Sequence, residues 1–248
     1  MSLLANIIFM KLILFVYDFP HKKSLKGMQL IKSYGLKDVV VISSPKIELK
    51  FRQSKNRISV LENEIIQPTN LAAQYGWESL VASHNSDESI SFLKQIQPSY
   101  GIILGSRILS KKVIECFSKG IINFHPGVLP ENRGLDNLKW AIYKNLPQGV
   151  TTHFIDEKID VGHKIFKEIL EIEIDDTVFD INSKLLDLQM NHLNQLLSTN
   201  FTIDNTESLD SSHISQKAVS DEIDNQIIKT FEDYKKEYSN ILTKYKNI

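Results

Sequence analysis

The sequence predicts an α/β fold, a Rossmann-like open and mostly parallel sheet with a small C-terminal helical extension. Apolar runs of strand length alternate along the chain with segments of helical pattern, which is the arrangement of parallel βαβ units. Turn residues such as Gly35 and Pro45 separate these segments. The 248 residues, 42% of them hydrophobic, are enough to bury a sizeable core. In such sheets ligands bind beyond the carboxyl ends of the strands.

The expected elements follow one another in this alternating order. Strands are expected at residues 11–19, 38–44, 78–83, 100–105, 120–125, 149–156 and 163–174, the last two paired antiparallel. Helices are expected at residues 24–35, 69–76, 86–98, 110–120, 135–145 and 177–198. Ser86 suits the N-cap of its helix, because Asp87 and Glu88 follow in the first turn. Residues 57–70 fit neither pattern clearly.

The two ends of the chain differ from the middle. Residues 1–9 read as a leader or optional extension before a catalytic domain over residues 10–199. Residues 200–219 have the polar composition of a linker, and residues 220–248 carry one apolar helical stripe. The stripe consists of Ile223, Ile227, Phe231, Tyr234, Tyr238, Ile241 and Tyr245. Either the main body or another subunit must cover it, and we expect a subunit contact in a homodimer.

Composition and charge argue against several classes of protein. The formal net charge of −1 provides no basic field for nucleic acid. Lys11 divides the N-terminal apolar run into pieces too short to span a bilayer, so no membrane partner is expected. The single cysteine, Cys116, fits a reducing, cytoplasmic location and is expected to be a small buried hydrophobe. Neither this cysteine nor the histidines show zinc-ligand spacing, so no metal is expected.

The segment INFHPG, residues 122–127, ends a strand with two polar side chains on one face. Asn123 and His125 alternate with apolar residues and therefore project together. An amide N–H can stabilise an oxyanion, and an imidazole can move a proton near neutral pH. The acidic candidates to orient the imidazole are Asp156, Glu157 and Asp160. Taken by itself, such a pair is also compatible with a hydrogen-bonded loop anchor that has no catalytic role.

A longer signature favours the catalytic interpretation. Residues 122–165 contain Asn-x-His-Pro, then Leu-Pro, Arg-Gly, a Trp-Ala-Ile helix, Gly-Val-Thr-x-His and Asp-x-Gly, in that order. This stretch resembles the core signature of the folate-dependent formyltransferases. YGIILGSRILS, residues 100–110, is similar to the strand and loop that receive the pterin in that family.

The resemblance implies a role for several residues. Asn123, His125 and Asp160 would form the catalytic triad, with N10-formyltetrahydrofolate as co-substrate and a primary amine as acceptor. The residues implied to bind the folate are Ser106, Arg107, Ile108, Leu109, Ile155, Asp156, Glu157 and Asp160. The residues implied to help bind the acceptor are Pro126, Gly127, Asn132, Arg133 and Gly134.

Other residues of the signature are interpreted as structural. His153 matches the histidine of Gly-Val-Thr-x-His and is expected to be a hydrogen-bonded scaffold residue. Trp140 is expected in the core, whereas His21 and His163 are expected to be ordinary loop residues.

The sequence departs from the signatures of several branches of the family, and these departures reduce the number of possible acceptors. FVYDFPHKKSLKG, residues 15–27, lacks the Gly-rich phosphate loop of the glycinamide ribonucleotide enzymes. Residues 201–248 hold six Lys and no Arg against nine Asp and Glu, a charge unfavourable for tRNA. Residues 1–9 are too short for the regulatory domain of the deformylases. We therefore expect a nucleotide-linked amino-dideoxy sugar, dTDP-linked and used for lipopolysaccharide O-antigen. ENRGLDN, residues 131–137, would then help hold the sugar nucleotide. The alternatives are a methionyl-tRNA formyltransferase-like enzyme and a non-catalytic binding module.

Overall fold

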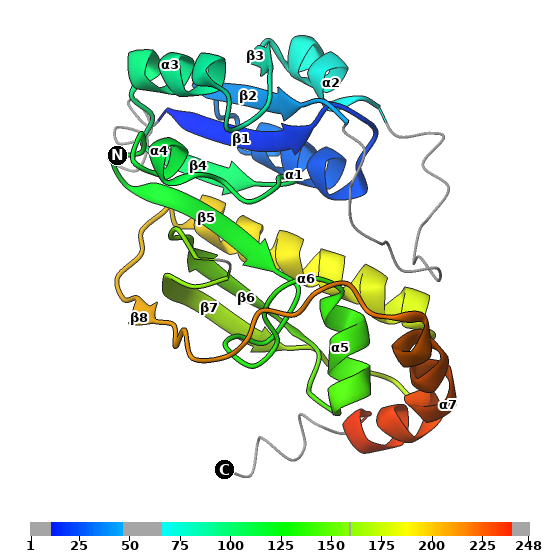
Figure 1. The fold of residues 1–248 in the computed structure, drawn as a ribbon. Coiled ribbons are helices and arrows are strands. Elements are labelled where there is room, and N and C mark those ends of the chain that lie inside the picture. Colours follow the sequence, from blue (N-terminus) through cyan, green and yellow to red (C-terminus); the bar gives the residue numbers. More distant parts are fainter. Residues whose placement is uncertain (1–10, 47–65, 159, 240–248) are drawn as a thin grey trace.

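A computed structural model describes residues 11–46, 66–158 and 160–239 (Figure 1). Its centre is one eight-stranded sheet in the order β3-β2-β1-β4-β5-β6-β7-β8. The strands are β1 (Leu12–Tyr17), β2 (Val39–Ser44), β3 (Glu78–Val81), β4 (Tyr100–Ile103), β5 (Gly120–His125), β6 (Gly149–Phe154), β7 (His163–Ile169) and β8 (Glu207–Ser208). β1 to β5 pair in parallel, whereas β6, β7 and β8 extend the sheet antiparallel. The predicted α/β fold with an open, mostly parallel sheet is therefore confirmed.

Helices cover both faces of the sheet, as the apolar strands require. They are α1 (Lys22–Ser33), α2 (Pro68–Tyr75), α3 (Asp87–Ile96), α4 (Lys111–Ile114), α5 (Asn137–Lys144), α6 (Val178–Ser198) and α7 (Asp221–Tyr238). Alternate residues of β1 serve the two faces: Leu12, Leu14 and Val16 pack with α1 and α6, whereas Ile13 and Phe15 pack with α3 and α4. The continuous apolar run of β1 is thus explained by burial on both sides.

Most predicted elements appear where the pattern placed them, with boundaries shifted by a few residues. Ser86 caps α3, and its hydroxyl accepts from the N–H of Ser89. α4 is much shorter than the helix predicted over residues 110–120, because the chain turns toward β5 after Ile114. Cys116 lies in this turn and is only partly buried, so the expectation of a buried cysteine is wrong. Most of the ambiguous stretch at residues 57–70 lies outside the described residues.

Part of the polar segment at residues 200–219 is packed on the main body. Its strand β8 pairs with β7, and Leu209 and Val219 are buried. A backbone bridge joins Gln216 to Gly134, on the loop that follows β5. The prediction of a linker that lets the tail leave the body is therefore wrong. Backbone hydrogen bonds and three buried apolar residues, Phe201, Leu209 and Val219, outweigh the polar composition of the segment.

The C-terminal helix α7 lies along α5, as Figure 1 shows. Ser220 caps it as its position in the sequence indicates. Ile227, Tyr234 and Tyr238 are buried in one cluster with Leu138 of α5 and residues of α6. The described part of the stripe is therefore covered by the chain itself, which was the alternative to a subunit contact. Ile241 and Tyr245 lie outside the described residues.

Side-chain hydrogen bonds also join α5 and the turn after it to the C-terminal segment. The hydroxyls of Tyr234 and Tyr238 donate to the carbonyls of Leu146 (2.8 Å) and Asn145 (2.6 Å), at the end of α5. Trp140 is only partly buried on α5, and its indole N–H donates to the Lys217 carbonyl at 2.7 Å, so the expectation of a core tryptophan is wrong. Among the described residues, no helix combines the length and the apolar character needed to cross a membrane.

Candidate active site

The site is built on the end of β5. β4 pairs with β5 only as far as Asn123, so the last two residues of β5 extend past β4 at the carboxyl edge of the parallel strands. Phe124 faces the α1 and α6 side, and Asn123 and His125 face the opposite side. A tight turn follows, in which the N–H of Gly127 donates to the His125 carbonyl at 2.9 Å. The strand therefore presents both polar side chains together, as the sequence predicts.

Asp160 reaches His125 from the loop between β6 and β7. Its Oδ1 lies 3.2 Å from Nδ1 of His125, and its Oδ2 accepts from the N–H of Gly134 at 2.8 Å. Burial raises the pKa of the Asp160 carboxyl, but the charge and hydrogen bond of His125 and the Gly134 N–H lower it to about 2. Asp160 is therefore ionised at neutral pH, and it holds a proton on the Nδ1 side of the imidazole.

The other side of the imidazole faces the loop after β5. His125 Nε2 lies 2.8 Å from the carbonyl oxygen of Asn132 and 3.1 Å from Nδ2 of Asn137. A Cβ at Gly127 would lie 2.8 Å from that Nε2, so only glycine allows the loop to approach so closely. His125 itself is 3% exposed. The ring is consequently fixed on both sides.

Asn123 is oriented by a second histidine. Its Nδ2 lies 3.4 Å from Nε2 of His153, on the adjacent strand β6. Nδ1 of His153 faces two carbonyls, those of Phe154 and Val161, and must therefore carry the proton of the neutral ring. Burial and the nearby charge of His125 lower the pKa of His153 to about 4. The neutral ring can thus accept from the Asn123 amide, and His153 is buried and hydrogen-bonded as a scaffold residue should be.

Comparison with known proteins agrees with this geometry. Residues 10–197 match the protein family described as formyl transferase. The chain belongs to this family. A methionyl-tRNA formyltransferase from Clostridium tetani is 30% identical over 168 residues, which are 64% of this chain and 49% of that protein. The chain thus spans about half the length of this curated relative. A second methionyl-tRNA formyltransferase, from Flavobacterium psychrophilum, is matched over 40% of its length.

Solved formyltransferases share the fold at low identity. An N-formyltransferase from Helicobacter canadensis, in complex with folinic acid and dTDP-3-aminofucose, is 21% identical with a TM-score of 0.60, and the match covers 86% of this chain and 73% of that one. Phosphoribosylglycinamide formyltransferase from Bacillus halodurans is 20% identical with a TM-score of 0.60, covering 79% of this chain and 98% of that one. These likenesses establish the formyltransferase fold.

The loop expected to bind folate in this formyl transferase family member follows β4. Tyr17 donates to the Ser106 carbonyl at 2.7 Å, and Asn85 donates to the Ile108 carbonyl at 2.9 Å. Leu109 is buried, whereas Ile108 is 62% exposed. The carbonyls of Ser106 and Ile108 therefore already have protein partners. The expected contact of the pterin with the backbone of Arg107, Ile108 and Leu109 stays a prediction.

The second segment expected to bind folate, Ile155 to Asp160, divides into two parts. Asp156 and Glu157 are exposed, and Glu157 pairs with Lys111 of α4 at 2.5 Å. Asp156 accepts from the N–H of Lys158 at 2.7 Å and so shapes its own turn. Among the described residues of this segment, only Asp160 reaches His125.

The residues expected to help bind the acceptor form the wall around His125. Asn132 and Arg133 are 1% and 5% exposed. The Arg133 guanidinium donates from Nη1 to the carbonyls of Ser211 (3.1 Å) and His213 (2.6 Å), so it ties the 200–219 segment to the site. Gly134 contributes its N–H to Asp160, and Pro126 and Gly127 form the turn after β5. In this arrangement their observed partners are protein groups, and contact with an acceptor stays a prediction.

Sequence reasoning missed the contacts of two polar residues near the site. Asn137 is the last residue of ENRGLDN, the segment expected to help hold the sugar nucleotide, and it lies at the start of α5 in contact with His125. Lys23 of α1 donates to the Phe124 carbonyl at 3.0 Å, and burial lowers the pKa of its ammonium to about 7. His21, expected in a loop, lies just before α1 with Nδ1 2.9 Å from the Ser24 hydroxyl, and burial lowers its pKa to about 4.

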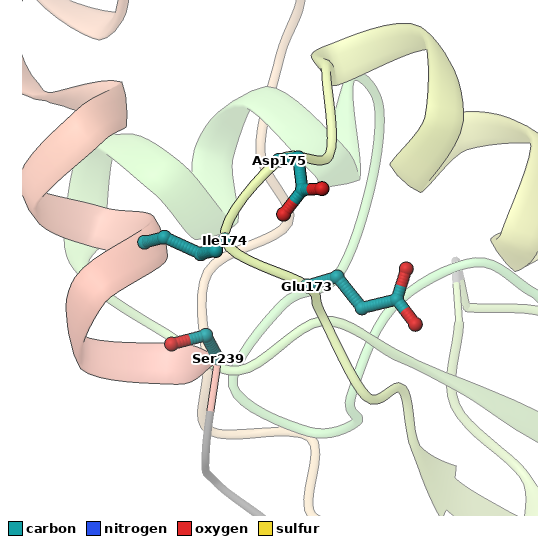
Figure 2. A pocket seen from close by; sticks show the side chains of 4 residues that line it. All are labelled: Glu173, Ile174, Asp175 and Ser239. Atoms are coloured by element: carbon teal, nitrogen blue, oxygen red, sulfur yellow. The ribbon is translucent and has the colours of Figure 1, made fainter.

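A surface pocket of about 630 Å³ lies away from these residues, between the chain after β7 and the end of α7 (Figure 2). Glu173, Ile174, Asp175 and Ser239 line it, and none of them was predicted to be a site residue. Within the described ranges no group of three His, Cys, Asp or Glu side chains is arranged to hold a metal ion.

Proposed function

We propose that this protein is an N-formyltransferase that transfers the formyl group of N10-formyltetrahydrofolate to a primary amine. The observation that carries the proposal is the 3.2 Å contact between His125 and the ionised Asp160 beside Asn123, in a chain of the formyl transferase family. These three side chains come from β5 and a loop 35 residues further along the chain, and a buried, hydrogen-bonded arrangement of this kind supports a catalytic role over a loop anchor.

The proposed reaction has two steps. The amine nitrogen attacks the formyl carbon, and the carbonyl electron pair moves to the oxygen. The bond from carbon to N10 then breaks, N10 takes up a proton, and the new amide nitrogen loses one. Asn123 Nδ2 would donate to the oxyanion, and its anchor on His153 at 3.4 Å preorganises that amide. The Asp160 carboxylate would stabilise the protonated form of His125. His125 would in turn stabilise the developing negative charge and mediate the proton transfer.

For the acceptor we propose a nucleotide-linked amino-dideoxy sugar, dTDP-linked and destined for lipopolysaccharide O-antigen. The net negative charge of residues 201–248 favours this acceptor over tRNA, and so does the packing of β8 and α7 on the body. A solved relative of the same fold is described in complex with dTDP-3-aminofucose. The second candidate acceptor is methionyl-tRNA. It is favoured by the curated relatives named methionyl-tRNA formyltransferase, which this chain matches over about half of their length or less.

An acceptor screen tests the proposal. The protein is incubated with N10-formyltetrahydrofolate and, separately, with dTDP-4-amino and dTDP-3-amino dideoxy sugars and methionyl-tRNA, and tetrahydrofolate release and formylated product are measured. Formylation of an amino sugar, abolished by His125→Gln, is the expected result. Formylation of methionyl-tRNA alone would replace the sugar by tRNA. Binding of the folate without turnover on any amine would make the protein a binding module.

A further inference from the structure

The Nε2 end of His125 lies between two asparagines. It is 2.8 Å from the Asn132 carbonyl oxygen and 3.1 Å from Asn137 Nδ2, and these two atoms are themselves 3.1 Å apart. All three residues are buried, with exposures of 3%, 1% and 7% for His125, Asn132 and Asn137. His125 Nε2, the Asn132 carbonyl oxygen and Asn137 Nδ2 therefore form a compact, buried triangle of hydrogen-bonding atoms.

The identity of the atoms in this triangle follows from hydrogen bonding alone. The Asn132 carbonyl oxygen can only accept, so the end of the Asn137 amide that faces it must be the nitrogen. That nitrogen has two N–H groups, one for the carbonyl and one for His125 Nε2. The Nδ1 side of His125 faces the Asp160 carboxylate and carries a proton in both charge states. The proton that the ring gains and loses is therefore the one on Nε2.

We propose that Asn137 is a positioning residue that lets His125 change its protonation state without losing a hydrogen bond. In the neutral ring, Nε2 accepts from Asn137 Nδ2. In the charged ring, the Nε2 proton is donated to the Asn132 carbonyl, which still accepts from Asn137. The inference rests on the proposed function, since it concerns the histidine assigned to proton transfer there.

The triangle is held rigidly by its own loop. Asn132 Nδ2 donates to the Asn137 carbonyl at 2.9 Å, and the Asn132 N–H donates to the Val128 carbonyl at 2.9 Å. A Cβ at Gly127 would lie 2.7 Å from the Asn132 carbonyl oxygen. A positioned pair of partners costs no reorganisation when the proton moves, which is the property that a proton-transferring residue needs.

Other charged or titratable groups also face His125. Asp160 faces it from the loop after β6. His153 faces it from β6, and burial together with the charge of His125 lowers the pKa of His153. Lys23 of α1 meets the carbonyl of the preceding residue, Phe124. These groups are unchanged in variants of Asn137. A shift in the titration of His125 in such variants therefore reports the lost Asn137 contact.

The test is a titration of His125 in the full chain, with ¹³C,¹⁵N-labelled imidazole rings and the signal assigned by its loss in His125→Gln. In the wild type, the neutral ring should carry its proton on Nδ1. Asn137→Leu removes the donor to the neutral ring and should raise the His125 pKa by about half to one unit. Asn137→Asp adds a carboxylate and should raise it by about one unit or more. Asn205→Leu and Asn205→Asp, the same changes at an exposed position, should leave it unaltered.

The outcomes separate this proposal from the proposed function. A neutral His125 with its proton on Nε2 would overturn the proposal, as would a pKa that stays the same or falls in the Asn137 variants. The wild-type tautomer and Asn137→Asp decide the matter if Asn137→Leu does not fold. The titration needs no formyl donor, so it can succeed while the acceptor screen fails. Where transfer is measured, the acidic limb of its pH profile should move upward with the His125 pKa.

Discussion

Asp160→Asn is the substitution whose effect the structure defines most closely. Asn has nearly the same shape as Asp but cannot hold the charge that faces His125 at 3.2 Å. The Asp160 side chain is 11% exposed, so little solvent screens this interaction. The pKa of Asp160 is lowered from 3.8 to about 2, and the ionised carboxylate must therefore stabilise the folded state.

The size and pH dependence of this contribution follow from the two pKa values. The shift from 3.8 to about 2, at about 1.4 kcal/mol per unit, gives about 2 kcal/mol of stability. Because the folded pKa is the lower one, this stability is fully present above the unfolded value and is lost as the pH falls toward about 2. Linkage predicts a loss of about 1 kcal/mol between about pH 5 and about pH 3.

Urea denaturation of the wild type and of Asp160→Asn at several pH values measures this contribution. The wild type should be more stable by about 2 kcal/mol at about pH 5, and the difference should shrink by about 1 kcal/mol at about pH 3. Asp204→Asn, at an exposed position, serves as the control and should match the wild type throughout. A stability difference that stays constant over this pH range would refute the assignment of a buried, charged Asp160 beside His125.

The remaining predictions concern the other groups of the site and the docking of α7. His125→Gln should lower kcat by about 10² or more in a folded protein, measured as formyl transfer with circular dichroism as the folding control, and near-normal kcat would remove His125 from the mechanism. Asn123→Ala should lower kcat more than it raises the folate KM, because its contact strengthens as the oxyanion forms; a change in KM alone would make it a binding residue. Lys139→Met should destabilise the chain by about 3 kcal/mol or more in urea, because it removes the ammonium that lies 2.5 Å from the buried Asp224 carboxylate, and Lys139→Met with Asp224→Leu should recover much of that loss. The homodimer stays a prediction. Ile228 on α7 is 67% exposed, and Ile228→Glu should dissociate a dimer formed through this helix, as measured by sedimentation. A wild-type protein that sediments as a monomer would exclude the homodimer.

The sequence by itself determined the local structure and the central pair of the site. Continuous apolar runs predicted β1 and β2, because strands buried on both faces need apolar residues at nearly every position. The alternation at the end of β5 placed Asn123 and His125 on one face, and backbone geometry requires this in any strand. The residues alone left three acidic candidates, and the resemblance to the formyltransferase signature singled out Asp160, which the structure brings to His125.

Only the tertiary structure decided how distant segments meet. Asn137 touches His125 because the loop after β5 folds back, and no periodicity encodes such a contact. The apolar stripe on α7 predicted that one face of the helix is buried, but not that α5 and α6 bury it. Apolar periodicity shows which side chains must leave solvent and does not identify the surface that they pack against. The polar segment before α7 is ordered by β8, by Arg133 and by Gly134, contacts that exist only once the sheet has formed. Neighbours along the chain fix helices and strands, whereas complementarity between remote surfaces fixes which of them pack together.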